Sequence, residues 1–221
     1  TTGRPKGVMV EHGNVASLVC NSYVSVCSDD VFAFLSSPIF DASTFELWTP
    51  LTKGNRLIIP SDLHRLVSDI VLFREFISQN GVSVFWLTKT LFESVYSFDN
   101  NVFKDVNCLI IGGEALDKSI VTKLVDSGLS SDVFLNGYGP TESTTFTCTY
   151  SLNQPITSNN VPIGTPINHR KAYVLDVHGN PVPIGVIGEL YIGGAGVARG
   201  YLNNEVLTAE RFISNPFASE S

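Results

Sequence analysis

Short apolar runs alternate with amphipathic segments along the first two thirds of the chain. Residues 82–87 and 108–111 are largely apolar runs of strand length, whereas residues 68–79 carry apolar side chains at helical spacing. Strands joined by helices pair in parallel, because a helical crossover returns the chain to the same edge of the sheet. The sequence therefore predicts an α/β fold of mainly parallel sheet with flanking helices. Strands are expected at 31–35, 56–59, 82–87, 108–111 and 132–135, and helices from Asn14 to about residue 23, from Asp41 or Ser43 to about residue 54, and over 68–79, 91–98 and 117–127.

The composition and the residue pattern of the sequence change after about Ser151. Prolines and glycine-rich turns become frequent, and they separate short β-branched runs at 172–177 and 188–193. Such a pattern is typical of β-rich structure. We therefore expect two parts of one core, an α/β part over 1–150 and a β-rich part over 151–221.

Composition excludes several classes of function. The 221 residues carry a net charge of -7, so the basic surface that nucleic acid or an anionic membrane requires is lacking, and no apolar run approaches the length of a membrane span. The four cysteines have no paired metal-ligand spacing, which favours reduced thiols and a cytoplasmic protein. The chain opens at Thr1, without Met and inside a polar loop, and we expect it to be a fragment.

The segment after the strand expected at 132–135 concentrates ligand-binding chemistry. Asn136-Gly137-Tyr138-Gly139-Pro140-Thr141-Glu142-Ser143 combines glycines, an aromatic ring, a hydroxyl and a carboxylate. Glycine allows close approach of backbone to a ligand, and carboxylate oxygens suit Mg²⁺. This segment is predicted to be a loop at the carboxyl edge of the sheet, where open α/β sheets bind ligands. An ordinary turn at the end of a strand explains the same residues equally well.

A second polar loop lies at the start of the chain. Thr1-Thr2-Gly3-Arg4-Pro5-Lys6-Gly7 supplies hydroxyls, glycines and a cation, which are the components of a phosphate-binding loop. It is not a Walker A loop, because Lys6-Gly7 runs into an apolar stretch and not into a helix. Taken alone, the segment is also consistent with a flexible polar terminus.

Four motifs in order, covering essentially the whole chain, resemble the adenylation domain of non-ribosomal peptide synthetases, within the adenylate-forming (AMP-binding) enzymes. This resemblance implies part of the N-terminal core of such an enzyme, with the mobile C-terminal subdomain absent. It also implies a fragment that is nearly inactive by itself. The motifs are Thr1-Thr2-Gly3-Arg4-Pro5-Lys6-Gly7-Val8, Phe40-Asp41-Ala42-Ser43, Asn136-Gly137-Tyr138-Gly139-Pro140-Thr141-Glu142, and Gly188-Glu189-Leu190-Tyr191-Ile192 followed by Gly196-Val197-Ala198-Arg199-Gly200-Tyr201-Leu202.

The implied reaction has two steps. A substrate carboxylate attacks the α-phosphorus of ATP and expels Mg-pyrophosphate, and the phosphopantetheine thiol of a carrier protein then takes the acyl group. By resemblance, Lys6, Thr141 and Glu142 are catalytic, with Glu142 holding Mg²⁺. The residues implied in ATP binding are Thr1, Thr2, Gly3, Lys6, Gly113, Glu114, Ala115, Asn136, Gly137, Tyr138, Gly139 and Thr141.

Asp41 indicates the class of substrate. A helix N-cap is a common and sufficient role for such an aspartate. In the resembling amino-acid-activating enzymes, however, this position pairs with the α-ammonium of the substrate, whereas related acyl-CoA synthetases usually have His there. A buried ammonium without a partner would be costly, so the carboxylate favours an amino acid.

The resemblance also implies a pocket for the amino-acid side chain. Its aromatic members crowd the pocket, and besides Asp41 none of its members is charged. The combination resembles that of valine-activating domains, with isoleucine and similar β-branched residues as neighbours. For each aromatic residue taken alone, plain core packing is the commoner role. The pocket residues are Asp41, Ala42, Phe45, Trp86, Ile110, Gly112, Gly137, Thr145 and Phe146.

Two other functions remain open from the sequence. One is an acyl-CoA or aryl-acid ligase of the same superfamily, against which Asp41 argues. The other is a non-catalytic binding or scaffold domain, against which the intact Lys6, Thr141 and Glu142 argue. The expected partners are a peptidyl carrier domain bearing phosphopantetheine and a condensation domain of the same synthetase.

Overall fold

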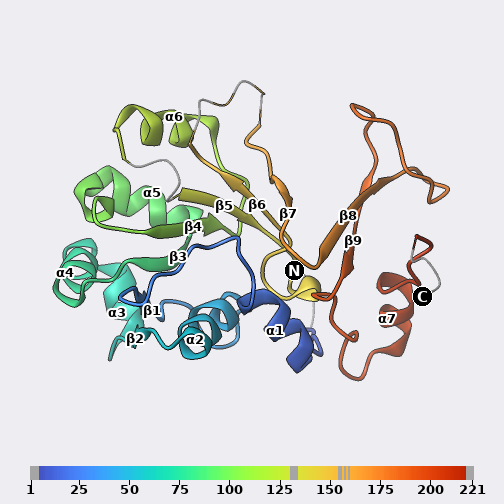
Figure 1. The fold of residues 1–221 in the computed structure, drawn as a ribbon, viewed down its shortest axis with the longest axis horizontal. Coiled ribbons are helices and arrows are strands. Elements are labelled where there is room, and N and C mark those ends of the chain that lie inside the picture. The colour runs from blue at the N-terminus through green and yellow to red at the C-terminus, as the bar shows by residue number, and fades with distance from the viewer. Residues whose placement is uncertain (1–4, 130–133, 154–155, 157, 159, 218–221) are drawn as a thin grey trace.

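The computed structural model describes residues 5–129, 134–153, 156, 158 and 160–217. Their largest element is a seven-stranded sheet in the order β2-β1-β3-β4-β5-β6-β7. The first five of these strands pair in parallel, and β6 and β7 are antiparallel to their neighbours (Figure 1). The predicted α/β fold with a mainly parallel sheet is confirmed. The strands are β1 (Val31–Ala33), β2 (Arg56–Ile58), β3 (Val84–Thr88), β4 (Cys108–Gly112), β5 (Phe134–Tyr138), β6 (Cys148–Ser151) and β7 (Thr165–Pro166).

Helices cover both faces of this sheet. In Figure 1, α1 and α2 lie on one face and α5 and α6 on the other, with α3 and α4 near the β2 end. Within the described residues, no helix is long and apolar enough to cross a membrane. The helices are α1 (His12–Val19), α2 (Ala42–Lys53), α3 (Leu63–Ser68), α4 (Ile70–Asn80), α5 (Lys89–Phe98) and α6 (Lys118–Asp126), with short 3₁₀ turns η1 (Asn100–Phe103) and η2 (Thr141–Ser143).

The last part of the chain forms a separate two-stranded sheet and a helix. β8 (Arg170–Leu175) pairs antiparallel with β9 (Glu189–Gly194), and α7 (Glu205–Arg211) follows (Figure 1). β7 nevertheless belongs to the large sheet, because Thr165 pairs with Thr149 of β6. The change of sheet therefore comes later than the change of composition at Ser151. The division into 1–150 and 151–221 stays a prediction.

Alternating side chains of the central strands build two cores. Leu109 and Ile111 of β4 pack into a cluster with α4, α5 and α6, whereas Ile110 packs with α1 and α2 on the opposite face. All three side chains are 0% exposed. A parallel sheet buried on both faces requires such continuous apolar strands, and this explains why the sequence pattern identified them.

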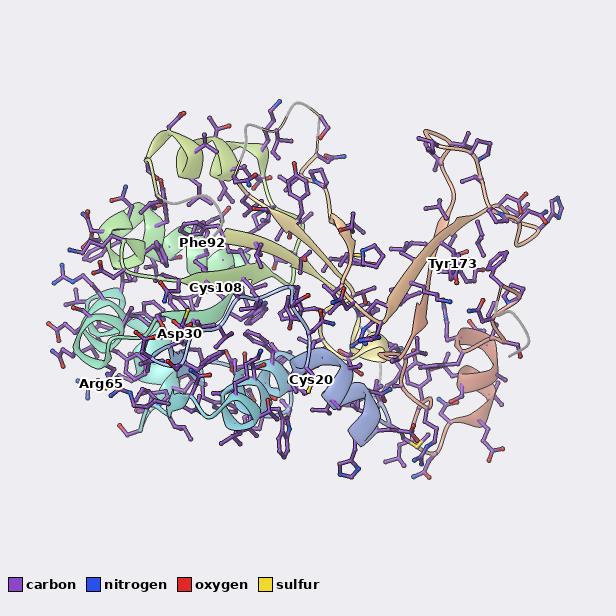
Figure 2. All side chains as sticks on the ribbon, viewed as in Figure 1. Cys20, Asp30, Arg65, Phe92, Cys108 and Tyr173 are labelled. Carbon is purple, nitrogen blue, oxygen red and sulfur yellow. The ribbon has the colours of Figure 1, made fainter. Side chains whose placement is uncertain are left out.

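Asp30 joins the amino ends of three strands. Its carboxylate accepts hydrogen bonds from Ser83 Oγ at 2.7 Å, Asn107 Nδ2 at 2.6 Å and the Cys27 amide at 2.7 Å. In Figure 2, Asp30 lies close to Cys108, which begins β4. Because Asp30 is 2% exposed, these donors stabilise a carboxylate that would otherwise be buried without partners.

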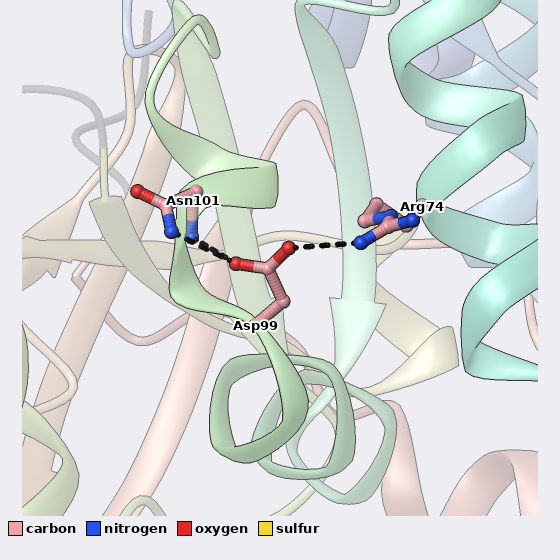
Figure 3. Close-up of polar contacts among 3 residues, drawn as sticks. All are labelled: Arg74, Asp99 and Asn101. Atoms are coloured by element: carbon pink, nitrogen blue, oxygen red, sulfur yellow. Dashed lines mark hydrogen bonds and ion pairs between the residues drawn. The ribbon is translucent and has the colours of Figure 1, made fainter.

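Asp99 connects α4 to the turn after α5 (Figure 3). It accepts hydrogen bonds from the side chain and the backbone amide of Asn101, both at 3.0 Å, and pairs with Arg74 of α4 at 3.5 Å. The two hydrogen bonds from Asn101 are the main reason why the pKa of Asp99 lies below its usual value. The contact caps η1 and fixes the exit of α5 against α4.

Several expectations about the helices are wrong in detail. Asn14 does not cap α1; it lies in the first turn, where its Oδ1 accepts the Glu11 amide at 2.8 Å and its Nδ2 bonds the carbonyls of Ala195 and Val197. The helix also ends at Val19, earlier than expected. α3 was not predicted, since six residues are too few for a clear periodicity.

Another correction concerns the loop expected from Asn136. β5 continues to Tyr138, because β6 pairs with it from Leu135 to Tyr138. The loop therefore begins at Gly139. Glycines suggested a turn here, but the antiparallel partner strand holds the segment extended.

Phe103 is expected to be a main contributor to stability. Its ring is 1% exposed and lies 5.3 Å from the ring of Phe92 and 6.2 Å from that of Phe134. Phe103→Ala should lower the free energy of unfolding by about 3–5 kcal/mol in urea unfolding, because a large cavity remains. The matched control is Phe98→Ala, at a ring that is 54% exposed. A loss below about 1 kcal/mol for Phe103→Ala would contradict this role.

Candidate active site

Three parallel strands deliver the predicted site residues to one edge of the sheet. Trp86 of β3 pairs with Ile110 of β4, and Gly112 of β4 pairs with Gly137 of β5. The exposed segment Gly113-Glu114-Ala115 therefore begins beside Tyr138, the last residue of β5. The structure thus brings together the two segments that the resemblance assigned to adenine.

The loop after β5 is held in an uncommon conformation. Thr144 and Thr145 have φ values of 54° and 67°, in the left-handed region that β-branched residues rarely adopt. Thr144 Oγ1 donates to the Gly196 carbonyl at 2.8 Å, and Thr145 Oγ1 donates to the Asp41 carbonyl at 2.7 Å. The two hydroxyls therefore tie one strained loop to the second and fourth motifs. Strain of this kind clusters at binding sites.

The first and fourth motifs pair with each other across almost the whole length of the chain. Val8 forms an antiparallel bridge with Tyr201, the Met9 amide donates to the Gly200 carbonyl at 2.8 Å, and the Leu202 amide donates to the Gly7 carbonyl at 2.8 Å. This pairing brings Lys6 Nζ to 5.2 Å from the centre of the Tyr201 ring. A cation over an aromatic face is attracted to it.

Tyr201 also connects Lys6 to the third motif. Its hydroxyl donates a hydrogen bond to the carboxylate of Glu142, and the Ala198 amide donates to the Glu142 carbonyl at 2.8 Å. Burial, followed by the hydrogen bond to Glu142, raises the pKa of Tyr201 to about 12, so the phenol remains a donor at neutral pH. Sequence reasoning missed Tyr201. Its place in the fourth motif was visible, but its contact with Glu142 depends on long-range pairing.

Lys6, Glu142 and Tyr201 share the wall of a polar cavity of about 530 Å³. β9 and α7 form the opposite wall. Thr141 lies beside Glu142 in η2 and is exposed. A cation and a carboxylate at one cavity can together bind a phosphate and its metal ion.

Asp41 stands at the N-cap position of α2 but does not act as a cap. Its side chain accepts no hydrogen bond from the first turn of the helix, and its backbone is already helical, with φ of -64°. The half-buried carboxylate is therefore not used by the backbone of α2. The plain N-cap role that the sequence allowed is excluded.

The residues predicted for the amino-acid pocket lie in mutual contact. The rings of Phe45 and Phe146 pack edge to face at 5.6 Å. A Cβ at Gly137 would lie 2.5 Å from Ile110 Cγ2 and 2.9 Å from Phe146. The space beside Gly137 is thus filled by these neighbours, and only glycine fits there. Ala42 is also buried, at the start of the same helix as Phe45.

Glu46 fixes the chain that leads to Asp41. Its side chain is 0% exposed, and its Oε2 accepts the amides of Leu35 at 3.2 Å and Ser36 at 2.9 Å. Burial raises the pKa of Glu46 to about 8, although both amides act in the opposite direction. Sequence reasoning missed this residue, since a glutamate inside an amphipathic helix is usually solvated.

For some of the residues predicted to bind ATP, the structure does not place a side chain at the site. Thr1, Thr2 and Gly3 lie outside the described residues. Asn136 is 6% exposed and its Nδ2 donates to the Pro162 carbonyl at 2.8 Å, so its amide connects β5 to the chain before β7. Its role beside adenine stays a prediction.

Comparison with known proteins identifies the arrangement. The family model described as AMP-binding enzyme matches residues 1–202, which is most of the chain. The chain belongs to the AMP-binding enzyme family. The four motifs that indicated this family are those that the structure brings together, and the resemblance to the adenylation domains of non-ribosomal peptide synthetases is confirmed.

Relatives of this AMP-binding chain are large synthetases. It is 46% identical over 222 residues to a linear gramicidin synthase of Brevibacillus parabrevis and 42% identical over 219 residues to tyrocidine synthase 3 of the same organism. These matches cover 98% and 99% of the chain. The chain spans only 3% of the length of each of these relatives.

Solved structures agree with this assignment. The chain superposes with a TM-score of 0.87 and 31% identity on holo-PA1221, an NRPS protein containing adenylation and PCP domains. The match includes 98% of this chain and 37% of the PA1221 chain. The N-terminal subdomain of NpsA from Klebsiella oxytoca, in complex with 3-hydroxyanthranilyl-AMSN, gives a TM-score of 0.87 and 29% identity, with 98% and 55% covered.

The residues at the polar cavity fit a magnesium ion that would arrive with a nucleotide. In the part of the chain that the structure describes, no group of three or more His, Cys, Asp or Glu residues could hold a metal ion by itself. Glu142 offers one carboxylate at the polar cavity. One or two carboxylates completed by substrate phosphates are the usual ligand set for Mg²⁺.

Glu46 should make stability depend on pH. The carboxyl keeps its proton up to about pH 8 in the folded state but loses it near 4.5 when unfolded, so stability falls as pH rises from 4.5 to 8. The side chain of the Glu46→Gln variant cannot ionise. The free energy of unfolding of this variant should therefore increase relative to that of the parent as the pH rises through this range. Urea unfolding at several pH values measures the difference.

The control for this test is Glu75→Gln, which removes an exposed carboxylate from α4. It reports the general effect of one negative charge. Parallel pH profiles for Glu46→Gln and the parent would show that Glu46 is ionised in the folded protein at all these pH values, which contradicts the effect of burial.

Proposed function

We propose that this chain is the substrate-binding part of an adenylation domain that uses ATP and Mg²⁺ to activate an amino acid. The selected amino acid is valine or a similar β-branched aliphatic residue. The aminoacyl group then passes to the phosphopantetheine thiol of a carrier protein. A condensation domain of the same synthetase is the other expected partner. The kinship with peptide synthetases and with holo-PA1221, which contains a PCP domain, supports this proposal.

The main support for this proposal is the burial and hydrogen bonding of Asp41. Its carboxylate is half-buried, makes no capping bond, and is positioned through the hydrogen bond between its own carbonyl and Thr145. Thr145 is followed by Phe146, whose ring meets Phe45. A negative charge beside an apolar aromatic cluster suits a ligand with an ammonium group next to a small apolar side chain.

The polar cavity supplies the nucleotide half of the reaction. Lys6 and Thr141 would bind phosphate oxygens, and Glu142 would hold the metal ion. Phosphoryl-type transition states gain from positioned charges more than from covalent chemistry. Only Ser143 and Thr144 lie between Glu142 and Thr145 in the chain, so the two halves of the proposed site are close in sequence.

An aryl acid is the second candidate substrate. It is favoured by the similarity to NpsA, which has been solved in complex with 3-hydroxybenzoyl-AMSN and anthranilyl-AMSN. An aryl acid without an aliphatic ammonium would leave the Asp41 carboxylate unpaired, which argues against it. A scaffold without chemistry would bind ATP independently of Thr141 and Glu142, so the ATP affinity of Thr141→Ala and Glu142→Gln variants tests that alternative.

Asp41→Ala should abolish amino-acid activation. The assay is amino-acid-dependent exchange between ATP and pyrophosphate across the proteinogenic amino acids, in a complete adenylation domain that carries these 221 residues. We expect exchange to peak at valine and to fall about 100-fold or more in the variant, because a buried charge without its partner costs about 3–5 kcal/mol. Asp105→Ala is the control, at a carboxylate that is 86% exposed.

Each other outcome has a definite meaning. A peak at another amino acid, lost in Asp41→Ala, keeps the reaction and rejects valine. Exchange with acids that lack an amino group, unchanged in Asp41→Ala, assigns the chain to the acyl or aryl ligases.

Tyr201→Phe should weaken the response to magnesium. The phenol hydroxyl orients the Glu142 carboxylate, and loss of such an outer hydrogen bond typically lowers metal affinity about 10- to 100-fold. The Mg²⁺ concentration for half-maximal exchange should therefore rise, and excess Mg²⁺ should restore the rate. Tyr191→Phe changes another tyrosine of the same cavity and is the control. An unaltered Mg²⁺ requirement in Tyr201→Phe would show that Tyr201 does not orient a metal ligand.

A further inference from the structure

Lys89 and Asp117 join two segments that leave the sheet side by side at its carboxyl edge. Thr88, the last residue of β3, pairs with Gly112, the last residue of β4. Lys89 begins α5 directly after Thr88, and Asp117 precedes the first residue of α6. The ammonium of Lys89 lies 2.7 Å from the carboxylate of Asp117. One ion pair therefore connects the starts of two neighbouring helices.

Asp117 gives its carboxylate to this ion pair and not to its own helix. It stands at the N-cap position of α6 with an extended backbone, at φ of -82°, yet its side chain accepts no hydrogen bond from the first turn. Thr88 holds the same position in α5 and does act as a cap, since its hydroxyl accepts the Leu91 amide at 3.3 Å. Lys89, and not an amide of α6, is thus the partner that orients the Asp117 side chain.

The ion pair fixes one end of the short segment between β4 and α6. At the other end, Gly112 is held by its pairing within the sheet. Residues 113–115 between these two points are exposed, and Gly113 has a left-handed backbone with φ of 84°. Leu116, which follows them, is 6% exposed and belongs to the core. The exposed residues 113–115 are those that the resemblance assigned to adenine.

The charge of Lys89 also acts on this segment directly. Its hydrogen bond to Asp117 is the main reason why the pKa of Lys89 lies above its usual value, and attraction to Glu93 and Glu114 acts in the same direction. The ammonium therefore stays charged at neutral pH. A cation near Glu114 offsets the repulsion between this carboxylate and an anionic nucleotide.

We propose that Lys89 is a positioning residue for the nucleotide, which acts through Asp117 to hold residues 113–115 where adenine is predicted to bind. This inference rests on the proposed function. A segment that is already held in its bound conformation loses less freedom on binding, so the ion pair should favour ATP. The helices α5 and α6 have a second contact, in which the Tyr96 hydroxyl donates to the Lys123 carbonyl at 2.8 Å. Loss of the ion pair should therefore loosen the segment without separating the helices.

The test measures exchange between ATP and pyrophosphate in the complete adenylation domain that carries these residues, with valine as substrate. In Lys89→Ala, KM for ATP should rise about fivefold, as expected for one exposed ion pair, while kcat stays within about twofold of the parent. KM for pyrophosphate should not change, because pyrophosphate has no adenine. Lys104→Ala is the matched control, since this lysine is 65% exposed and pairs with Asp105 at 3.9 Å. It should leave all three constants unchanged.

A double-mutant cycle shows whether the effect passes through the ion pair. Asp117→Asn keeps the size of the side chain, removes its charge and should raise KM for ATP as Lys89→Ala does. The combined variant should be no worse than either single variant, because both remove the same interaction. Additive effects would show that the two residues act independently and would overturn the inference. Lys89→Arg keeps the cation, and its KM for ATP should lie closer to that of the parent than the KM of Lys89→Ala does.

Two further results would contradict the role of Lys89. An unchanged KM for ATP in Lys89→Ala would show that the ion pair does not position the nucleotide, and an equal rise in KM for ATP and pyrophosphate would show a general loss of the site. Asp117→Asn supplies the same measurement if Lys89→Ala does not fold. A parent domain that activates no amino acid would instead reject the proposed function. The ATP affinities of the parent and Lys89→Ala, measured by calorimetry, then still test Lys89, so the two failures are distinguishable.

Discussion

The close approach of β4 and β5 at Gly112 and Gly137 is the constraint on which the site depends. A Cβ at Gly112 would lie 2.3 Å from the Gly137 carbonyl oxygen, a distance that no side chain tolerates. Together with the pairing of β3 and β4, it brings Trp86, Ile110 and Tyr138 to one edge of the sheet. A larger residue at Gly112 would push the strands apart, and this would displace the predicted adenine and amino-acid contacts together.

The loops at that edge are fixed by polar groups buried beneath them. Thr145 holds the Asp41 carbonyl, and Glu46 holds two amides of the chain that leads from β1 to Asp41. A single hydrogen bond adds only about 1 kcal/mol, but its loss leaves a buried group without a partner at a further cost of about 1–3 kcal/mol. Removing either side chain should therefore disorder the position of Asp41 more than its own contacts suggest.

The sequence predicted what local patterns encode. The apolar strands β3 and β4 were identified because both of their faces are buried, and Gly54 and Gly81 end α2 and α4 as expected. The extended conformation of 136–138 was not predicted, because it depends on pairing with β6 ten residues later. The role of Tyr201 was missed for the same reason. Its contact with Glu142 requires residues 7–9 to pair with 199–202, and no local pattern encodes that pairing.

The two halves of the site differ in how they are supported, and this difference limits how each can change. Lys6 and Thr141, which are predicted to contact the nucleotide, are exposed, so a substitution at either position should have little effect on packing. Phe45, Ile110 and Phe146 are at most 3% exposed and belong to the core beneath α1 and α2. Any change that alters the size of the predicted amino-acid pocket would also repack this core, at a cost of about 1–5 kcal/mol. Trp86 is only half-buried and borders a cavity, so a smaller side chain there should disturb the core less than a change at any of these three residues.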